Sequence, residues 1–174
     1  PEPEPEPEPE PYTYDPTIFT YSTGPDTESY DINIDSNSFP SKTNLESIHF
    51  SDAVESIAIG TFKECTSLIS IIFPVNTEFK TIASSNSLGT FKGCTSLESV
   101  DIPIYVTSIG NSAFQNCTSI KKIHSPGVIT YGEKAFKGCT DLDNNLVIPH
   151  STTTIGNKAF EECSSNFVLF LTTT

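Results

Sequence analysis

The chain has 174 residues and a formal net charge of −13 at pH 7, and all nine of its basic residues are lysines. This length suits one domain with a short appendage. The lysines are scattered rather than clustered, and no apolar run is long enough to cross a bilayer. We therefore expect neither nucleic-acid binding nor membrane insertion.

Residues 1–11 read PEPEPEPEPEP. Proline fixes φ and biases each preceding glutamate toward extended geometry, so this segment is predicted to be a polyproline II arm about 34 Å long. Three interpretations remain open: a spacer, a recognition segment, or a part that docks in an assembly. Residues 12–31 are predicted to form an N-terminal cap or strand segment. Within it, Thr17–Ser22 is expected to be a strand before a Gly24–Pro25 turn.

A repeat occupies residues 32–174. Its five cysteines are 29, 23, 22 and 24 residues apart, and a phenylalanine precedes each cysteine by three positions. An apolar residue follows each of the first four cysteines by three positions, and a proline then closes the unit. The phenylalanines and cysteines are predicted to form the structural core: Phe62, Cys65, Phe91, Cys94, Phe114, Cys117, Phe136, Cys139, Phe160 and Cys163.

Every unit predicts the same path of the chain. The segment before the proline alternates with period two, which indicates a short strand with its apolar residues inward. Val106–Gly110 indicates a second extended piece that turns at glycine, and Ala113–Cys117 indicates a tight turn. A unit of this length cannot cover its own apolar side, so the units must stack. We expect a right-handed solenoid of about six coils of 22–29 residues, with a short parallel β-sheet on one face.

The units Val106–Pro126 and Thr153–Cys163 resemble the BspA-type leucine-rich repeats, because Gly, Ala-Phe, Cys, Leu and Pro recur in one register. The resemblance covers roughly residues 32–171, nearly all of the domain, and implies a leucine-rich-repeat solenoid. It also implies a setting, because members are typically surface or secreted proteins of bacteria and protists, associated with adhesion and protein binding. The chain departs from the pattern at an insertion, Ala83–Leu88, at Ser125, at Asn144–Asn145 and in the last unit, Asn166–Leu171.

The cysteines recur once per coil, so each is interpreted as a small buried hydrophobe, with a disulfide between adjacent coils or a metal site as the alternatives. The three histidines, His49, His124 and His150, are expected on the surface. The register brings no nucleophile to a base, and Asp141–Asn145 lacks the glycine and distant glutamate of a calcium loop. We therefore expect no enzyme, no metal and no cofactor. Asn116 is a possible N-glycosylation site in the sequon Asn116-Cys117-Thr118.

The outward strand positions are predicted to form a protein-binding face. They are Ser70, Ile72, Ser99, Asp101, Lys122, His124, Asn145 and Val147. Their mixed chemistry suits a protein better than a repetitive polymer, and a merely solvated sheet face is the alternative.

The two ends of the repeat predict self-assembly, because terminal strands without protective charges can pair with a neighbouring molecule. The residues concerned are Ile18, Phe19, Tyr21, Phe167, Val168, Leu169, Phe170 and Leu171. The alternative is that residues 12–30 fold back as an intramolecular cap.

Two functional hypotheses follow. The first is a non-enzymatic extracellular or cell-surface solenoid that mediates protein contact and adhesion. The second is a structural subunit that joins head to tail into an extracellular filament through its terminal strands and its Pro-Glu arm. The partner is another protein in the first hypothesis and the chain itself in the second.

Overall fold

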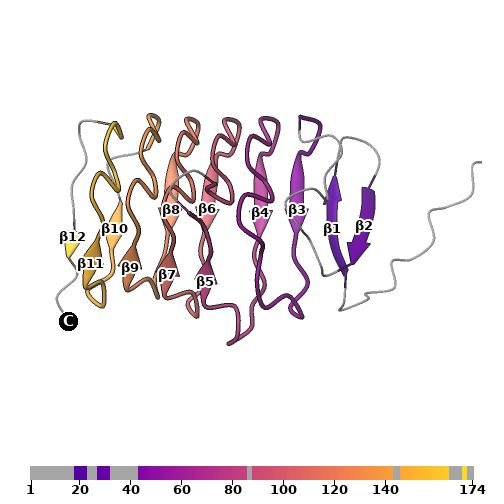
Figure 1. Ribbon diagram of the computed structural model, residues 1–174, viewed down its shortest axis with the longest axis horizontal. Helices are drawn as coiled ribbons and strands as arrows, with labels where there is room; N and C mark the ends of the chain where they lie inside the picture. Colours follow the sequence, from indigo (N-terminus) through magenta and orange to yellow (C-terminus); the bar gives the residue numbers. More distant parts are fainter. Residues whose placement is uncertain are drawn as a thin grey trace, which may run out of the picture.

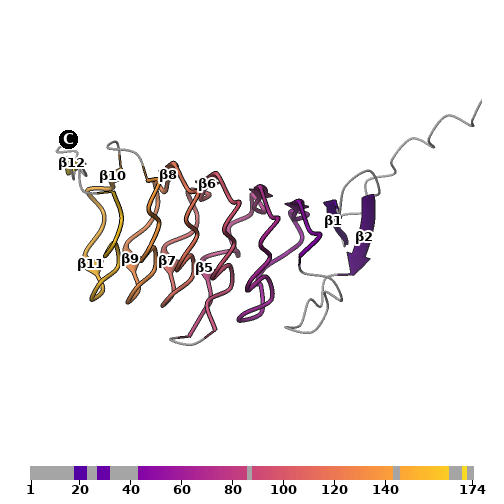
Figure 2. The same cartoon turned by 90° about the horizontal axis from the view of Figure 1, so that it is seen from above.

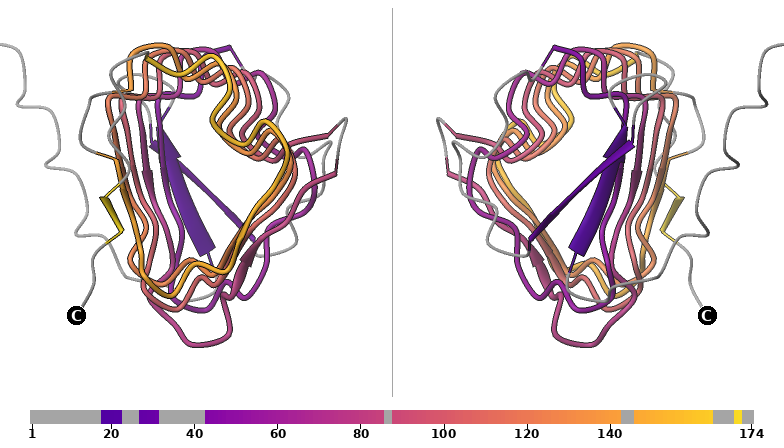
Figure 3. Two further views of the ribbon diagram at one scale, coloured as in Figure 1. Left: turned by 90° about the vertical axis from the view of Figure 1, so that its left-hand side faces the viewer. Right: turned by 90° about the vertical axis from the view of Figure 1, so that its right-hand side faces the viewer.

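The computed structural model describes residues 18–22, 27–31, 43–85, 88–142, 146–164 and 170–171. These residues form a β-solenoid whose coils stack along the long axis of the molecule (Figures 1 and 2), and they contain no α-helix. Seen end-on, the coils project onto one outline (Figure 3). The predicted fold class is therefore confirmed. The Pro-Glu arm, the Gly24–Pro25 turn, Asn145 and Phe167 to Leu169 lie outside the described residues.

The first sheet carries one short strand per coil. Its strands are β3 (Ser47–His49), β4 (Ser70–Ile72), β6 (Ser99–Asp101), β8 (Lys122–His124), β10 (Val147–Ile148) and β12 (Phe170–Leu171). Parallel ladders join β3 to β4, β6 to β8 and β10 to β12, and among the described strands no ladder joins β4 to β6 or β8 to β10. In β4, β6 and β8 only the middle residue is buried. This is the alternation that the sequence predicts for a strand with one face in the core.

A second parallel sheet covers another face of each coil. It contains β5 (Thr81–Ile82), β7 (Ser108–Ile109), β9 (Thr130–Tyr131) and β11 (Thr154–Ile155), in the order β11-β9-β7-β5. β7 lies in the second extended segment predicted at Val106–Gly110. The glycine after β9 is required for close approach rather than for a positive φ: a Cβ on Gly132 would lie 2.6 Å from the backbone nitrogen of Asn111 in the preceding coil.

The tight turn that follows the second sheet is stacked from coil to coil. Phe62, Phe91, Phe114 and Phe136 are buried, and each ring stacks on the ring of the next coil with centroids 5.0–5.6 Å apart. The positions two residues before and two residues after this phenylalanine mostly have left-handed φ. The residues with positive φ are Gly60, Glu64, Gly93, Ser112, Asn116, Lys134, Gly138, Lys158 and Glu162.

Four of the five cysteines contribute a hydrogen bond as well as apolar packing. The Cys117 Sγ lies 3.1 Å from the carbonyl oxygen of Phe91 in the preceding coil, and Cys94, Cys139 and Cys163 repeat this contact. All five thiols are free. Burial raises the pKa of Cys94 and Cys139 well above the ordinary thiol value, and it raises that of Cys163 to about 11. The thiols of Cys94, Cys139 and Cys163 therefore stay protonated donors at neutral pH.

Ser125 departs from the repeat for a reason that the structure supplies. It is 2% exposed, and its Oγ lies 2.6 Å from the hydroxyl oxygen of Tyr131, which is fully buried. Ile109, one coil earlier, occupies the position of Tyr131, so the serine leaves room for the larger phenol and supplies its partner. Ser125 and Tyr131 therefore compensate each other in size and in hydrogen bonding.

At the N-terminal end, β1 (Ile18–Ser22) and β2 (Thr27–Asp31) form an antiparallel hairpin, and β1 also pairs antiparallel with β3. In Figure 3 both strands lie across the end of the coil stack. Both edges of β1 are thus occupied within the chain. Thr20 pairs with His49, so Ile18 lies past the carboxyl end of β3.

Candidate protein-binding face

The outward face of the first sheet is a flat surface built by a rigid scaffold. Ser70, Ser99 and Lys122 form one exposed column, because the parallel register places equivalent residues of successive coils side by side. Ile72, Asp101, His124 and Val147 form a second exposed column at the carboxyl ends of the strands. The structure thus gathers on one face every predicted binding residue that it describes.

Large apolar side chains are exposed on this face. Ile72 is 55% exposed, Val147 is 45% exposed, and Ile69, just before β4, is 49% exposed. The corner beyond the strands adds Val75 at 66% and Ile104 at 62%. Ile69, Val75 and Ile104 were not among the predicted binding residues, because they lie outside the strand positions of the first sheet. Apolar surface that is gathered in this way is characteristic of contact sites.

Charged groups lie between the apolar ones. The Nδ1 of His124 is 2.7 Å from the Oδ1 of Asp101, and the Nζ of Lys121 is 3.5 Å from the Oε2 of Glu98. All four side chains are more than half exposed, so these pairs contribute little to stability. Lys122 forms no ion pair with any described residue. Acidic groups therefore line β6, and basic groups line β8.

A groove of about 470 Å³ lies between β8 and β10. It is lined by Ile123, His124, Ser125, Pro126, Val147, Pro149, His150 and Ser151. Within the described residues no ladder joins β8 to β10. The fifth coil is also one residue longer at this point, because four positions separate Leu142 from Leu146, whereas three separate the equivalent Leu97 and Val100.

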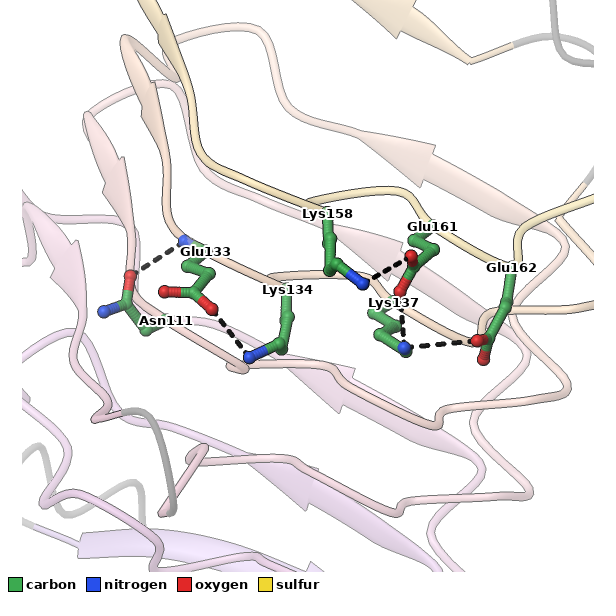
Figure 4. Close-up of polar contacts among 7 residues, drawn as sticks. All are labelled: Asn111, Glu133, Lys134, Lys137, Lys158, Glu161 and Glu162. Carbon is green, nitrogen blue, oxygen red and sulfur yellow. Dashed lines mark hydrogen bonds and ion pairs between the residues drawn. The ribbon is translucent and has the colours of Figure 1, made fainter.

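The turn side carries a different arrangement, a network of ion pairs between adjacent coils (Figure 4). Lys137 contacts the carboxylate of Glu161 and lies 3.1 Å from that of Glu162, while Lys158 lies 2.9 Å from Glu161. Hydrogen bonds from Lys137 and Lys158 lower the pKa of Glu161, and those from Lys137 to Glu161 and Glu162 raise the pKa of Lys137. Opposite charges satisfy one another here, so we interpret the network as structural.

The other predicted positions do not form a chemical centre. Asn116 is exposed in a left-handed turn, but the next residue of its sequon, Cys117, is fully buried. No group of three or more potential metal ligands occurs in the described part of the chain. Of the predicted self-assembly residues, Ile18, Phe19 and Tyr21 lie in β1, while Phe170 and Leu171 form β12 beside β10. No helix among the described residues is long and apolar enough to cross a membrane.

The chain is similar to one protein family and to solved structures. The family model of the BspA type leucine rich repeat region matches six copies over residues 32–166. A leucine-rich repeat protein from Bacteroides ovatus is 22% identical, with a TM-score of 0.49 over 86% of this chain and 51% of its own. A leucine rich cell surface protein from Faecalibacterium prausnitzii is 23% identical, with a TM-score of 0.40 over 72% of this chain and 47% of its own. The chain thus spans about half the length of each. No curated protein matches.

Proposed function

The chain belongs to the BspA-type leucine-rich repeat family, and we propose that it is a non-enzymatic module that binds another protein through the outward face of its first sheet. The proposed setting is extracellular or at the cell surface, and the proposed task is adhesion. The family supports a role in protein interaction in general. The choice of face and the task are our proposal.

One observation carries the choice of face. Ile69, Ile72 and Val147 are each about half exposed on a sheet whose inward residues are buried. Exposed isoleucine and valine beside separated charges give a partner both apolar contact area and points of orientation. Because the coils are fixed by backbone hydrogen bonds and stacked rings, the face needs no ordering on binding, which favours affinity.

An adhesion assay with matched variants tests this proposal. Beads that carry the chain would be applied to immobilised extracellular proteins and to whole cells, and retention would be counted. Ile72→Asp should abolish retention, because it places a charge in the contact. Ile129→Asp is the control, since Ile129 is also exposed, at 38%, but lies next to the second sheet. Equal retention of both variants would refute the assignment of the face.

A second candidate, the structural subunit of a filament, is supported by the C-terminal end of the second sheet. β11 pairs only with β9 among the described strands. Ile155 in β11 is 45% exposed, whereas the equivalent Ile82 and Ile109 are fully buried. Such an edge can accept a strand from a second molecule.

Light scattering and negative-stain electron microscopy at rising protein concentration test the filament. Polymers in the wild type that are lost in Ile155→Lys but kept in Ile72→Asp would support it. A monomer at all concentrations would refute it.

A further inference from the structure

The groove between β8 and β10 has a candidate occupant in the chain itself. Its walls combine two prolines, the apolar Ile123 and Val147, and two imidazoles, those of His124 and His150. Lys122 lies two residues before His124 on the same exposed side of β8. Lys122 forms no ion pair with a described residue, and the Nδ1 of His124 already contacts Asp101, which leaves the Nε2 of His124 for a ligand. These groups lie beside apolar walls in a protein of net charge −13. The groove suits an acidic, proline-rich, extended peptide.

Residues 1–11 have this chemistry, because they alternate proline with glutamate. In polyproline II geometry, glutamates two residues apart are spaced about 6 Å along the arm. Outward residues two apart on a strand, such as Lys122 and His124, are spaced about 6.6 Å. Because polyproline II has three residues per turn, successive glutamates point about 120° apart around the arm, and each side of the arm carries both glutamates and prolines. Whichever side faces the groove therefore offers carboxylates to the basic groups and pyrrolidine rings to the apolar walls, which include Pro126 and Pro149.

The arm can reach the groove from its own anchor point. Ile18 lies past the carboxyl end of β3, the same edge of the sheet at which His124 and His150 lie. Four strand spacings, β1 to β3, β4, β6 and β8, amount to about 19 Å. The seven residue steps from Ile18 back to Pro11 span about 23 Å when extended. Pro11 can therefore lie above β8, with Glu10 and Glu8 over the groove.

We infer that the Pro-Glu arm docks into the groove of its own chain and pairs its glutamates with Lys122, His124 and His150. Exposed ion pairs are individually weak, so a free peptide of this sequence would bind poorly. A tether raises the local concentration of the arm to the millimolar range, which favours docking within one chain. Two chains of net charge −13 would repel one another. This docking does not require the proposed partner, but Val147 belongs both to the groove and to the proposed binding face, so a docked arm would cover that part of the face.

Zero-length cross-linking of the full chain tests the inference. A carbodiimide joins a carboxylate to an amine only when the two are in contact, and mass spectrometry identifies the linked peptides. We expect glutamates of the arm to be linked to Lys122 and Lys121 in the monomer, with a yield that falls as salt is added. Lys122→Glu should lower the total yield at least about threefold. Lys80→Glu is the control, because Lys80 is also exposed but precedes β5 in the second sheet.

Two outcomes would overturn the inference. The first is that the arm forms no cross-links, or that it is linked to Lys80 as often as to Lys122. The other is found by mixing equal amounts of 15N-labelled and unlabelled chains. If roughly half of the arm cross-links joined a labelled to an unlabelled chain, the arm would dock between molecules instead.

A second measurement does not depend on lysine chemistry. Replacing all five arm glutamates by glutamine keeps the length and the prolines but removes the charge. We expect the backbone amide resonances of Lys122, His124 and His150 to shift between this variant and the wild type, while those of Thr130 and Tyr131 in β9 stay unchanged. Identical spectra outside the arm would overturn the inference.

Discussion

The buried Ser125–Tyr131 pair offers the sharpest test of the packing argument. Tyr131→Phe removes the hydroxyl that lies 2.6 Å from the Ser125 Oγ, and the serine is then left 2% exposed without this partner. An unpaired buried hydroxyl costs about 1–3 kcal/mol, so we expect a loss near 2 kcal/mol and a fall in Tm of about 6 °C for a chain of this size. Ser125→Ala leaves the phenol unpaired and should cost a similar amount.

The double variant decides whether the two residues act as a unit. Removing both hydroxyls leaves no orphaned group, so Ser125→Ala/Tyr131→Phe should cost less than the two single changes together, with a coupling of about 1–2 kcal/mol. Urea unfolding followed by circular dichroism measures all four forms. Tyr105→Phe is the control, since Tyr105 is 43% exposed and should have no effect. Single-variant losses that simply add in the double variant would refute the pairing argument.

Three further predictions use the same unfolding measurement. Glu64→Gly should stabilise the chain by about 0.5–1 kcal/mol, because Glu64 has a φ of 62° at a position where Gly93 and Gly138 stand in other coils; destabilisation would contradict this. Gly132→Ala should cost about 2–3 kcal/mol, because its Cβ would lie 2.6 Å from the backbone of Asn111; an unchanged midpoint would show that the coils can separate freely. The free energy of unfolding should be constant below pH 9 and should fall as the pH rises toward 11. Burial raises the pKa of Cys163 from 9.0 to about 11 and raises that of Tyr131 as well, so the unfolded chain loses these protons at a lower pH than the folded state does. A free energy of unfolding that does not change over this pH range would contradict the burial of these groups.

The repeat register predicted the core because each coil places the same residue type in the same environment. Phe114 and Cys117 could be assigned inward from their recurrence, and the structure has both fully buried. The recurrence could not predict that the thiol also donates a hydrogen bond. A hydrogen bond from Cys117 to Phe91 joins atoms 26 residues apart, and it exists only once the coils are stacked.

Departures from the repeat were harder to interpret than the repeat itself. Ser125 was recognised as a polar residue at an apolar position, but its partner Tyr131 could be identified only from the contact between them. The longer fifth coil was also visible in the sequence. The ladders are interrupted between β4 and β6 as well as between β8 and β10, and these interruptions depend on how neighbouring backbones align, which spacing along one coil does not determine.

The exposure of Ile155 has a consequence for the order in which the molecule opens. In a one-dimensional stack each coil is held by its neighbours, and disruption starts where a neighbour is missing. Ile155 is 45% exposed, whereas Ile109, two coils earlier, is fully buried. Amide protons of β11 should therefore exchange with deuterium well before those of β7, and protection should increase inward from the C-terminal coil. Local unfolding would therefore begin at the C-terminal coil and proceed inward, while the central coils stay folded.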